Sequence, residues 1–375
     1  MRLVRHPLEH TAPGTHRELV SLHYGPTGGA KALIQAGLHA DEVPALLVAH
    51  HLRGRLEALE AEGRLRGEIV LLPYANPIGL DQRLLHHPIG RFDLASGENF
   101  NRHYADLVPR VAARVAEALS GDAVADVAAV RAALHDACAE LPADDELQTL
   151  RRKLLGLAID ADVVLDLHSD NEAVLHLYTA TPLWPEVESL ASLLGVELSL
   201  VATTSGDEPF DEACSTVWPR LATEVSRRLG REVRLPGACI AATIELRGET
   251  DVDHALAARD AEAILAWLVV RGLVDGPAPS LPPVGPPPWP LTGCMPVIAP
   301  SAGIVAWRRP VGVIVAAGEP LADLVDPSTG ETRVLTSPTD GLFFARELRR
   351  YATAGAKLAK VAGRAERRTG KLLSA

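Results

Sequence analysis

The segment KALIQAGLHADE, residues 31–42, decides the fold class, because it joins a short apolar strand through a glycine to the start of a helix. Residues 31–36 predict a buried strand, and apolar residues near helical spacing predict an amphipathic helix over about 42–59. Asp41 is expected to cap this helix, and Pro44 suits its first turn. A strand that leads directly into a helix is the repeating unit of an α/β sheet.

The same alternation continues through the first three-quarters of the chain. Further buried strands are expected at 68–73, 161–168, 173–179 and 238–246. Helices are expected over about 104–158, 184–194, 210–229 and 254–272. Strands that alternate with helices predict an α/β fold with a mainly parallel or mixed central sheet, covered by helices on both faces.

The composition changes at PAPSLPPVGPPPWP, residues 277–290, which predicts a stiff proline-rich linker. Beyond it, residues 291–364 contain short β-prone runs separated by Gly, Pro and Asp, as is typical of a small all-β domain. The expected organisation is therefore an α/β catalytic domain over 1–276, the linker, and a small β-sandwich or barrel-like domain over 291–375.

Composition limits the function classes. The 375 residues are 47% hydrophobic and 23% charged, with a net charge of -11, and no basic run is long enough to follow a phosphate backbone. The four cysteines form no CxxC pair, which argues against a disulfide framework and against a thiolate metal site. The first residues lack the apolar stretch of a signal peptide, and no apolar run is long enough to span a membrane. We expect a cytoplasmic protein that binds neither nucleic acid nor membranes.

A candidate metal site begins with His39 and Glu42, which are two residues apart where a strand ends and a helix starts. Ligands of open α/β sheets bind at the carboxyl ends of strands, and catalytic zinc often takes two His and one Glu. The pair alone is more typical of a loop His and a helix-capping Glu, so a third ligand is needed. His168 ends the apolar run VVLDLH and supplies it, unless it is a core histidine. Asp166 lies on the same face of the strand as His168. It is either a carboxylate that orients an imidazole or a hydrogen-bond acceptor in the core.

Glu245 interrupts the apolar strand ACIAATIEL, where burial of a carboxylate is costly unless it is paired or functional. Near a metal it would act as a general base. The alternative is a salt bridge to Arg247 or another arginine.

The segment GENFNRHY, residues 97–104, offers Asn101 and Arg102 as adjacent donors for a substrate carboxylate. Upstream, Arg83 closes NPIGLDQR, and Arg91 follows in the next turn. Either guanidinium could stabilise an oxyanion on the attacked carbonyl. Isolated arginines of this kind are more often solvated surface groups.

Taken in order, GLHADE, NPIGLDQR, ENFNRHY, DLHSD and TIELRG resemble the motifs of the zinc carboxypeptidase superfamily. They look closest to its succinylglutamate desuccinylase/aspartoacylase branch. The resemblance covers about residues 30–270, and the expected C-terminal β domain is similar to the one appended in that branch.

The resemblance assigns roles that agree with the chemistry of the residues. It implies one Zn²⁺ per chain, held by His39, Glu42 and His168. It implies that Asn101 and Arg102 bind the substrate carboxylate and that Glu245 is the general base. The oxyanion-stabilising arginine is Arg83 or Arg91, and Arg83 is preferred because it closes its motif.

The chain departs from the family pattern at two places. The Asn-Arg pair lies in ENFNR rather than DLNR, so the shape of the carboxylate pocket is in question. Asp170 and Glu172 follow the metal histidine and add negative charge. One hypothesis is that Asp170 accepts a positively charged substrate group; the alternative is a pair of solvated loop acids.

The expected function is therefore a zinc-dependent amidohydrolase that cleaves the amide bond of a small N-acyl amino acid or a related carboxylate. One alternative is a metallocarboxypeptidase acting on peptides, which a pocket roofed by the β domain would disfavour. Another is a non-catalytic zinc-binding module. Family analogy also leads us to expect a homo-oligomer.

Overall fold

A nine-stranded mixed sheet forms the centre of the computed structural model, which describes residues 1–282, 285 and 287–373. Within these residues the strand order is β1-β2-β4-β3-β7-β11-β9-β10-β12, and five of the eight neighbouring pairs are parallel. The strands are β1 (Arg2–Pro7), β2 (Glu18–Tyr24), β3 (Lys31–Ala36), β4 (Glu68–Leu72), β7 (Val163–Asp170), β9 (His176–Ala180), β10 (Leu198–Ala202), β11 (Ile240–Gly248) and β12 (Trp289–Pro290). This arrangement confirms the predicted mainly parallel α/β sheet.

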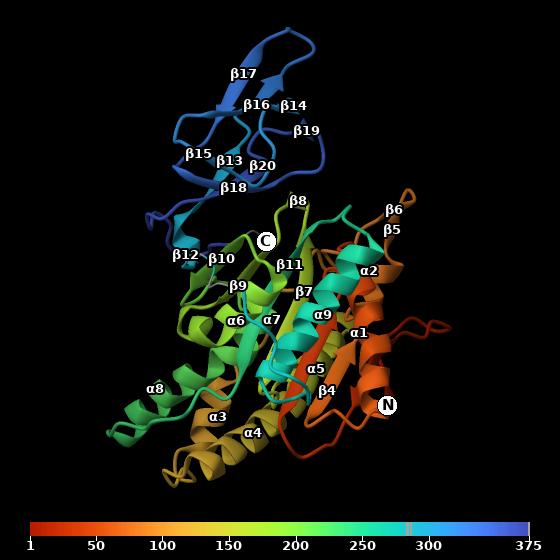
Figure 1. Ribbon diagram of the computed structural model, residues 1–375, viewed down its shortest axis with the longest axis vertical. Coiled ribbons are helices and arrows are strands. Elements are labelled where there is room, and N and C mark those ends of the chain that lie inside the picture. Colours follow the sequence, from red (N-terminus) through yellow and green to blue (C-terminus); the bar gives the residue numbers. More distant parts are fainter. Residues whose placement is uncertain (283–284, 286, 374–375) are drawn as a thin grey trace.

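Helices cover both faces of the sheet (Figure 1). One face packs against α1 (Pro44–Ala61), α6 (Trp184–Leu194) and α9 (His254–Val270). The other packs against α3 (Val108–Val115), α4 (Ala123–Ala139), α5 (Glu146–Ala158), α7 (Phe210–Ser215) and α8 (Val217–Leu229). Successive side chains of a strand point to opposite faces, so Ile34 joins the first apolar layer and Leu33 the second.

Several boundaries differ from the sequence prediction. Asp41 does not cap α1, because the N-cap position is Val43 and no side chain bonds to the first turn. The helical region expected over 104–158 is divided into three helices; Gly121 adopts a φ of +88° just before Asp122, whose side chain caps α4. Strands β1, β2 and β10 were not expected.

The C-terminal part is built from antiparallel strands, as predicted. One sheet contains β13 (Cys294–Ile298), β20 (Lys357–Ala362), β18 (Gly341–Arg346) and β15 (Val313–Val315). The other contains β17 (Thr332–Thr336), β16 (Pro320–Val325), β14 (Gly303–Trp307) and β19 (Tyr351–Ala352). The shared apolar cluster includes Val305, Leu324, Phe343 and Val361.

Short elements complete the chain. They are the helix α2 (Pro77–Asp81), the hairpin of β5 (Arg83–Leu84) and β6 (His87–Pro88), and 3₁₀ turns at Thr181–Leu183 and Leu291–Gly293. The end of the proline-rich segment pairs as β12 with the edge of the large sheet, while residues 283, 284 and 286 of that segment lie outside the described residues.

The two parts are joined through β8 (Glu172–Ala173), which follows β7 and pairs with β18 of the C-terminal sheet. The C-terminal sheets therefore lie against the end of the large sheet from which β8 emerges (Figure 1). Val174 continues the pairing through its N–H, which donates to the Phe344 carbonyl at 3.0 Å. None of the described helices is long and apolar enough to cross a membrane.

Candidate metal centre and active-site cavity

The first two candidate ligands follow directly from β3. Gly37 ends that strand with a φ of +68°, and a Cβ there would lie 2.7 Å from the Leu46 side chain. Glycine allows this close turn, which directs His39 and Glu42 to the carboxyl end of the sheet. His168 comes from the neighbouring strand β7, so the parallel pairing of β3 with β7 brings the three residues together.

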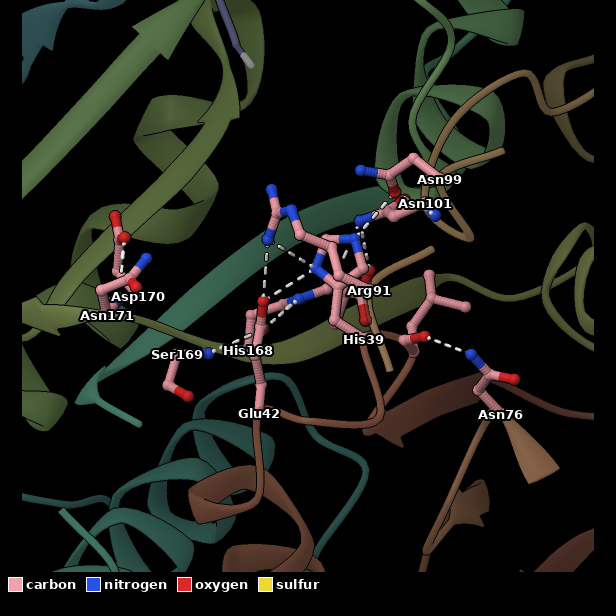
Figure 2. A network of polar contacts seen from close by, with 12 residues as sticks. His39, Glu42, Asn76, Arg91, Asn99, Asn101, His168, Ser169, Asp170 and Asn171 are labelled. Carbon is pink, nitrogen blue, oxygen red and sulfur yellow. Dashed lines mark hydrogen bonds and ion pairs between the residues drawn. The ribbon is translucent and has the colours of Figure 1, made fainter. Parts of the chain in front are cut away.

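Glu42 lies between the two imidazoles, as Figure 2 shows. Its Oε1 is 2.8 Å from His39 Nδ1, and its Oε2 is 2.7 Å from His168 Nδ1. One possible ligand atom from each residue falls within 4.8 Å of the others, and all three side chains are buried. No second cluster of this kind occurs in the described part of the chain.

The opposite nitrogen of each imidazole is held by an acceptor. His39 Nε2 lies 2.8 Å from Asn99 Oδ1, which also accepts the Asn101 N–H at 2.8 Å. His168 Nε2 lies 3.0 Å from Asp166 Oδ2. These contacts orient both rings so that each Nδ1 faces Glu42. Metal-binding histidines usually have such a hydrogen-bond acceptor at the nitrogen that does not bind the metal.

This geometry fits a bound cation. If each Nε2 carries the proton that it donates, each neutral ring turns an Nδ1 lone pair toward a carboxylate oxygen. Lone pairs facing each other at 2.7 to 2.8 Å need a positive charge between them, either protons or a metal ion. Two imidazole nitrogens and one carboxylate are also a donor set that zinc prefers at catalytic sites.

The electrostatics of the three side chains agree with this requirement. Burial lowers the pKa of His39, and the charge of Arg91 lowers it further. Burial opposes ionisation of Glu42, yet His39 and His168 hold its pKa well below the usual range. Burial would likewise lower the pKa of His168, but Asp166 and Glu42 raise it well above 6.5. The cluster therefore keeps an ionised carboxylate together with positive charge.

Glu245 lies beside the cluster because β11 pairs with β7 in parallel and places Glu245 opposite His168. Its Oε2 is buried and has no hydrogen-bond partner among the described residues. Burial raises the pKa of Glu245 to about 8, and the nearby Glu42 charge adds to the effect. The alternative of a salt bridge to Arg247 is not what forms, since Arg247 makes a bidentate pair with Asp260 at 2.8 and 2.9 Å.

These groups line one cavity of about 330 Å³. Its floor is made by His39, Glu42, His168 and Glu245 at the strand ends. Its roof comes from the C-terminal sheets, through Arg346, Arg349, Lys357 and Lys360. The cavity is therefore formed by both parts of the chain.

Comparison with known proteins identifies the family. A model of the succinylglutamate desuccinylase/aspartoacylase catalytic domain matches residues 28–127. A solved structure of a succinylglutamate desuccinylase/aspartoacylase family protein from Shewanella amazonensis SB2B is 31% identical, with a TM-score of 0.83 over 96% of this chain and 98% of that one. This chain belongs to the succinylglutamate desuccinylase/aspartoacylase family. Membership and the His–Glu–His group together indicate a metal-dependent hydrolase.

Other solved members extend the comparison. A Shewanella frigidimarina NCIMB 400 protein with the same family designation is 26% identical, with a TM-score of 0.81 and 96% of each chain covered. The product-bound ectoine utilization protein from Ruegeria pomeroyi is 14% identical, with a TM-score of 0.66 over 96% of this chain and 94% of that one, and shares the fold. A search among curated proteins gave no match.

Of the two arginines considered for the oxyanion, only Arg91 lies in the cavity of this family member. Its Nη1 is 3.1 Å from Glu42 Oε1 and 3.2 Å from His39 Nδ1 (Figure 2). Gly90 permits this approach, because a Cβ there would overlap the Asp41 N at 2.3 Å. Arg83 lies on the exposed β5–β6 hairpin and donates to the backbone carbonyls of Leu80 and Gln82. The position of Arg91 in the cavity therefore favours it over Arg83, the arginine preferred from the sequence.

Asn101 and Arg102 both line the cavity but are held differently. Asn101 is tied into the scaffold: its Oδ1 accepts the Phe210 N–H at 2.9 Å and its Nδ2 lies 3.3 Å from His168 Nε2. Arg102 is buried, and its Nη1 donates to the Asn101 carbonyl at 2.6 Å. Burial and the like charge of Arg91 lower its pKa, against the opposing effect of Asp211.

Asp170 and Glu172 do not offer free charge to a substrate. Asp170 Oδ2 lies 2.5 Å from Lys360 Nζ, and the pair is only partly exposed. Glu172 pairs with Arg346 and Arg350, both from the C-terminal part. Asp170 therefore lines the cavity as an ion-paired group, and both acids connect the metal-site loop to the C-terminal part of the chain.

Sequence reasoning missed two groups that the structure brings to the site. Asn99, which holds His39, is two residues before Asn101 in the quoted motif and could have been noticed as a further amide at the same turn. Lys360 lies on β20, far along the chain, and no pattern in the sequence pointed to its partner Asp170.

Proposed function

We propose that this protein is a zinc-dependent amidohydrolase that removes the acyl group from a small N-acyl amino acid. The observation that carries the proposal is the convergence of His39, Glu42 and His168, with both Nδ1 atoms facing Glu42 and both Nε2 atoms held by acceptors. The group opens onto the cavity of about 330 Å³, where a substrate amide would meet it.

His39, Glu42 and His168 would hold the zinc ion. When bound, zinc lowers the pKa of a water molecule and polarises the substrate carbonyl. Glu245 lies on the adjacent strand, with a buried oxygen that has no partner among the described residues. In the proposed reaction this carboxylate accepts a proton from the attacking water and later returns it to the departing amine.

Arg91 and Arg102 would bind the charged parts of the reacting substrate. Arg91 lies at the edge of the group formed by the three candidate metal ligands. There its guanidinium would stabilise the oxyanion that forms on the attacked carbonyl. Arg102 would bind the substrate carboxylate through its planar guanidinium. Asn101 would position Arg102 through its backbone carbonyl, and its side-chain Oδ1 would hold the first residue of α7, Phe210.

The shape of the cavity supports a small substrate over a peptide. A cavity of about 330 Å³ is at the lower end of the range for small-molecule sites. The C-terminal sheets cover it through Arg346 and Lys360, so an extended peptide would have to displace them. This supports a deacylase over a metallocarboxypeptidase with the same residues.

A substrate screen tests the proposal. The zinc-loaded protein would be offered N-acetyl, N-succinyl and N-formyl amino acids beside peptides with the same C-terminal residues, and amine release would be measured. We expect hydrolysis of at least one N-acyl amino acid, with Glu245→Gln as the inactive control that still binds zinc. Hydrolysis of the peptides alone would favour the carboxypeptidase, and zinc binding with no turnover on either set would favour a non-catalytic module.

A further inference from the structure

The last described residues of the chain return to the active-site cavity. After β20 the chain runs back toward the large sheet, where the Arg367 and Arg368 N–H groups donate to the Thr292 carbonyl at 3.0 and 2.9 Å. Arg368 also donates through Nη1 to the Cys294 carbonyl at 3.1 Å. Two residues further on, Lys371–Leu373 form what is called the tail segment below.

The tail segment is fixed to the loop that follows β10. The Leu372 N–H donates to the Ser205 carbonyl at 2.8 Å, and Lys371 Nζ pairs with Asp207 Oδ1 at 2.7 Å. Gly206, with a φ of +92°, lets the two backbones approach, since a Cβ there would lie 3.2 Å from Lys371 Cα. A loop and a tail that meet through backbone, ion-pair and close-packing contacts have one defined arrangement.

The same loop supports the substrate-binding side of the cavity. The Ser205 N–H donates to Glu212 Oε1 at 2.6 Å. The carbonyls of Asp207 and Glu208 accept the N–H groups of His103 and Tyr104, directly after Arg102. The tail segment and the Arg102 turn are therefore attached to the same loop.

The tail segment contributes apolar surface to the cavity. Leu372 is 5% exposed and packs in a cluster with Tyr178, Leu200 and Leu291. Leu373 packs against this cluster and lines the cavity itself. Other apolar residues that line the same cavity include Ala180, Leu200, Ala202, Pro209 and Leu291. A cavity lined by apolar groups and a buried guanidinium is suited to an amino acid whose carboxylate is bound and whose side chain is apolar.

We infer that Leu373 forms, with Leu200 and Leu291, an apolar side-chain subsite, and that the tail segment sets the size of the amino acid accepted there. This inference rests on the proposed function and names its substrate class: N-acyl derivatives of amino acids with small or medium apolar side chains. A pocket that differs by one or a few methylene groups discriminates between substrates by roughly 10-fold or more.

The test compares size preference in the wild type, Leu373→Ala and Leu373→Trp. The substrates are alanine, leucine and phenylalanine, each carrying the acyl group found in the screen, and kcat/KM is measured for each. Leu373→Ala is expected to raise the phenylalanine-to-alanine ratio of kcat/KM roughly 10-fold. Leu373→Trp is expected to lower it. Lys371→Gln removes only the exposed ion pair to Asp207. It should also raise the phenylalanine-to-alanine ratio of kcat/KM, but by less than Leu373→Ala does.

Leu281→Ala is the matched control, because Leu281 is half exposed and does not line the cavity. Thermal unfolding of each variant shows whether it is folded. Unchanged ratios in folded Leu373→Ala and Leu373→Trp would overturn the inference.

A binding measurement separates this inference from the proposed function. The zinc-loaded wild type and Leu373→Ala would be titrated calorimetrically with free alanine, leucine and phenylalanine. The affinities measure binding at the subsite without turnover. A shifted affinity ratio together with no hydrolysis of any N-acyl amino acid would support the subsite and reject the deacylase. No shift in either binding or turnover would reject the subsite.

Discussion

Replacing Asp166 with asparagine is expected to weaken zinc binding about 10- to 100-fold, the usual effect of losing the acceptor behind a metal-binding histidine. Asp166 is fully buried; its Oδ2 lies 3.0 Å from His168 Nε2 and its Oδ1 accepts from Gln35 at 2.9 Å. Asparagine keeps one acceptor and turns an NH₂ group toward one of these two donors. An unsatisfied buried donor costs about 1–3 kcal/mol, and about 1.4 kcal/mol is a factor of ten in affinity, which agrees with the expected range.

The assay is a competition titration of zinc against a chromophoric chelator at neutral pH. Asp126→Asn is the matched control, since Asp126 is also buried and accepts the Ser120 and Gly121 N–H groups far from the cavity. It should lower stability and leave zinc affinity unchanged. If folded Asp166→Asn bound zinc as tightly as the parent chain, the role assigned to this carboxylate would be refuted.

Three further predictions follow from the site. Glu245→Gln should reduce kcat about 10²- to 10⁴-fold with zinc content unchanged, as measured by amine release and metal analysis; retained turnover would remove Glu245 as the base. Arg91→Ala should reduce kcat about 10²- to 10³-fold while Arg83→Ala leaves it unaltered, and equal losses would contradict the placement of the oxyanion. Burial opposes ionisation of Asp170, but Lys360 lowers its pKa from 3.8 to about 2. Because the folded-state pKa is depressed, the ion pair contributes about 2 kcal/mol above pH ~4, and this is lost as pH falls toward 2. Denaturation curves of Lys360→Met should lack this acid-dependent loss; a curve parallel to that of the parent would contradict it.

The metal ligands could be predicted because they follow from local rules. His39 and Glu42 come directly after a strand, and His168 ends another strand, so parallel pairing alone brings their side chains to one edge. Glu245 could be predicted for the same reason, since a carboxylate in a buried strand needs a function or a partner. The residues alone left alternative roles open for each of these side chains. The order of the motifs along the chain was needed to assign them.

The choice between Arg83 and Arg91 depended on loop geometry that the sequence does not specify. Both follow the same helix, but the β5–β6 hairpin turns Arg83 toward solvent. Arg91 is directed inward by the close contact of Gly90 with Ala40 and Asp41, which only the folded backbone shows.

The ion pair of Asp170 could not be predicted for a different reason. Its charge is neutralised by Lys360, which is 190 positions away and belongs to another sheet. A pairing between distant segments leaves no local pattern, so the acid looked free. The breaks within the helical region expected over 104–158 were not predicted for a simpler reason: they depend on short turns such as that at Gly121.

The sharing of β8 between the two parts of the chain constrains how such proteins can be recombined. Glu172 and Ala173 stand five residues or fewer from His168, yet their backbone partners are Arg346 and Ala345. A chimera that exchanged the C-terminal sheets alone would pair β8 with a foreign strand and leave Glu172 without Arg346 and Arg350. A productive exchange between relatives would have to transfer β8 and the C-terminal sheets as one unit.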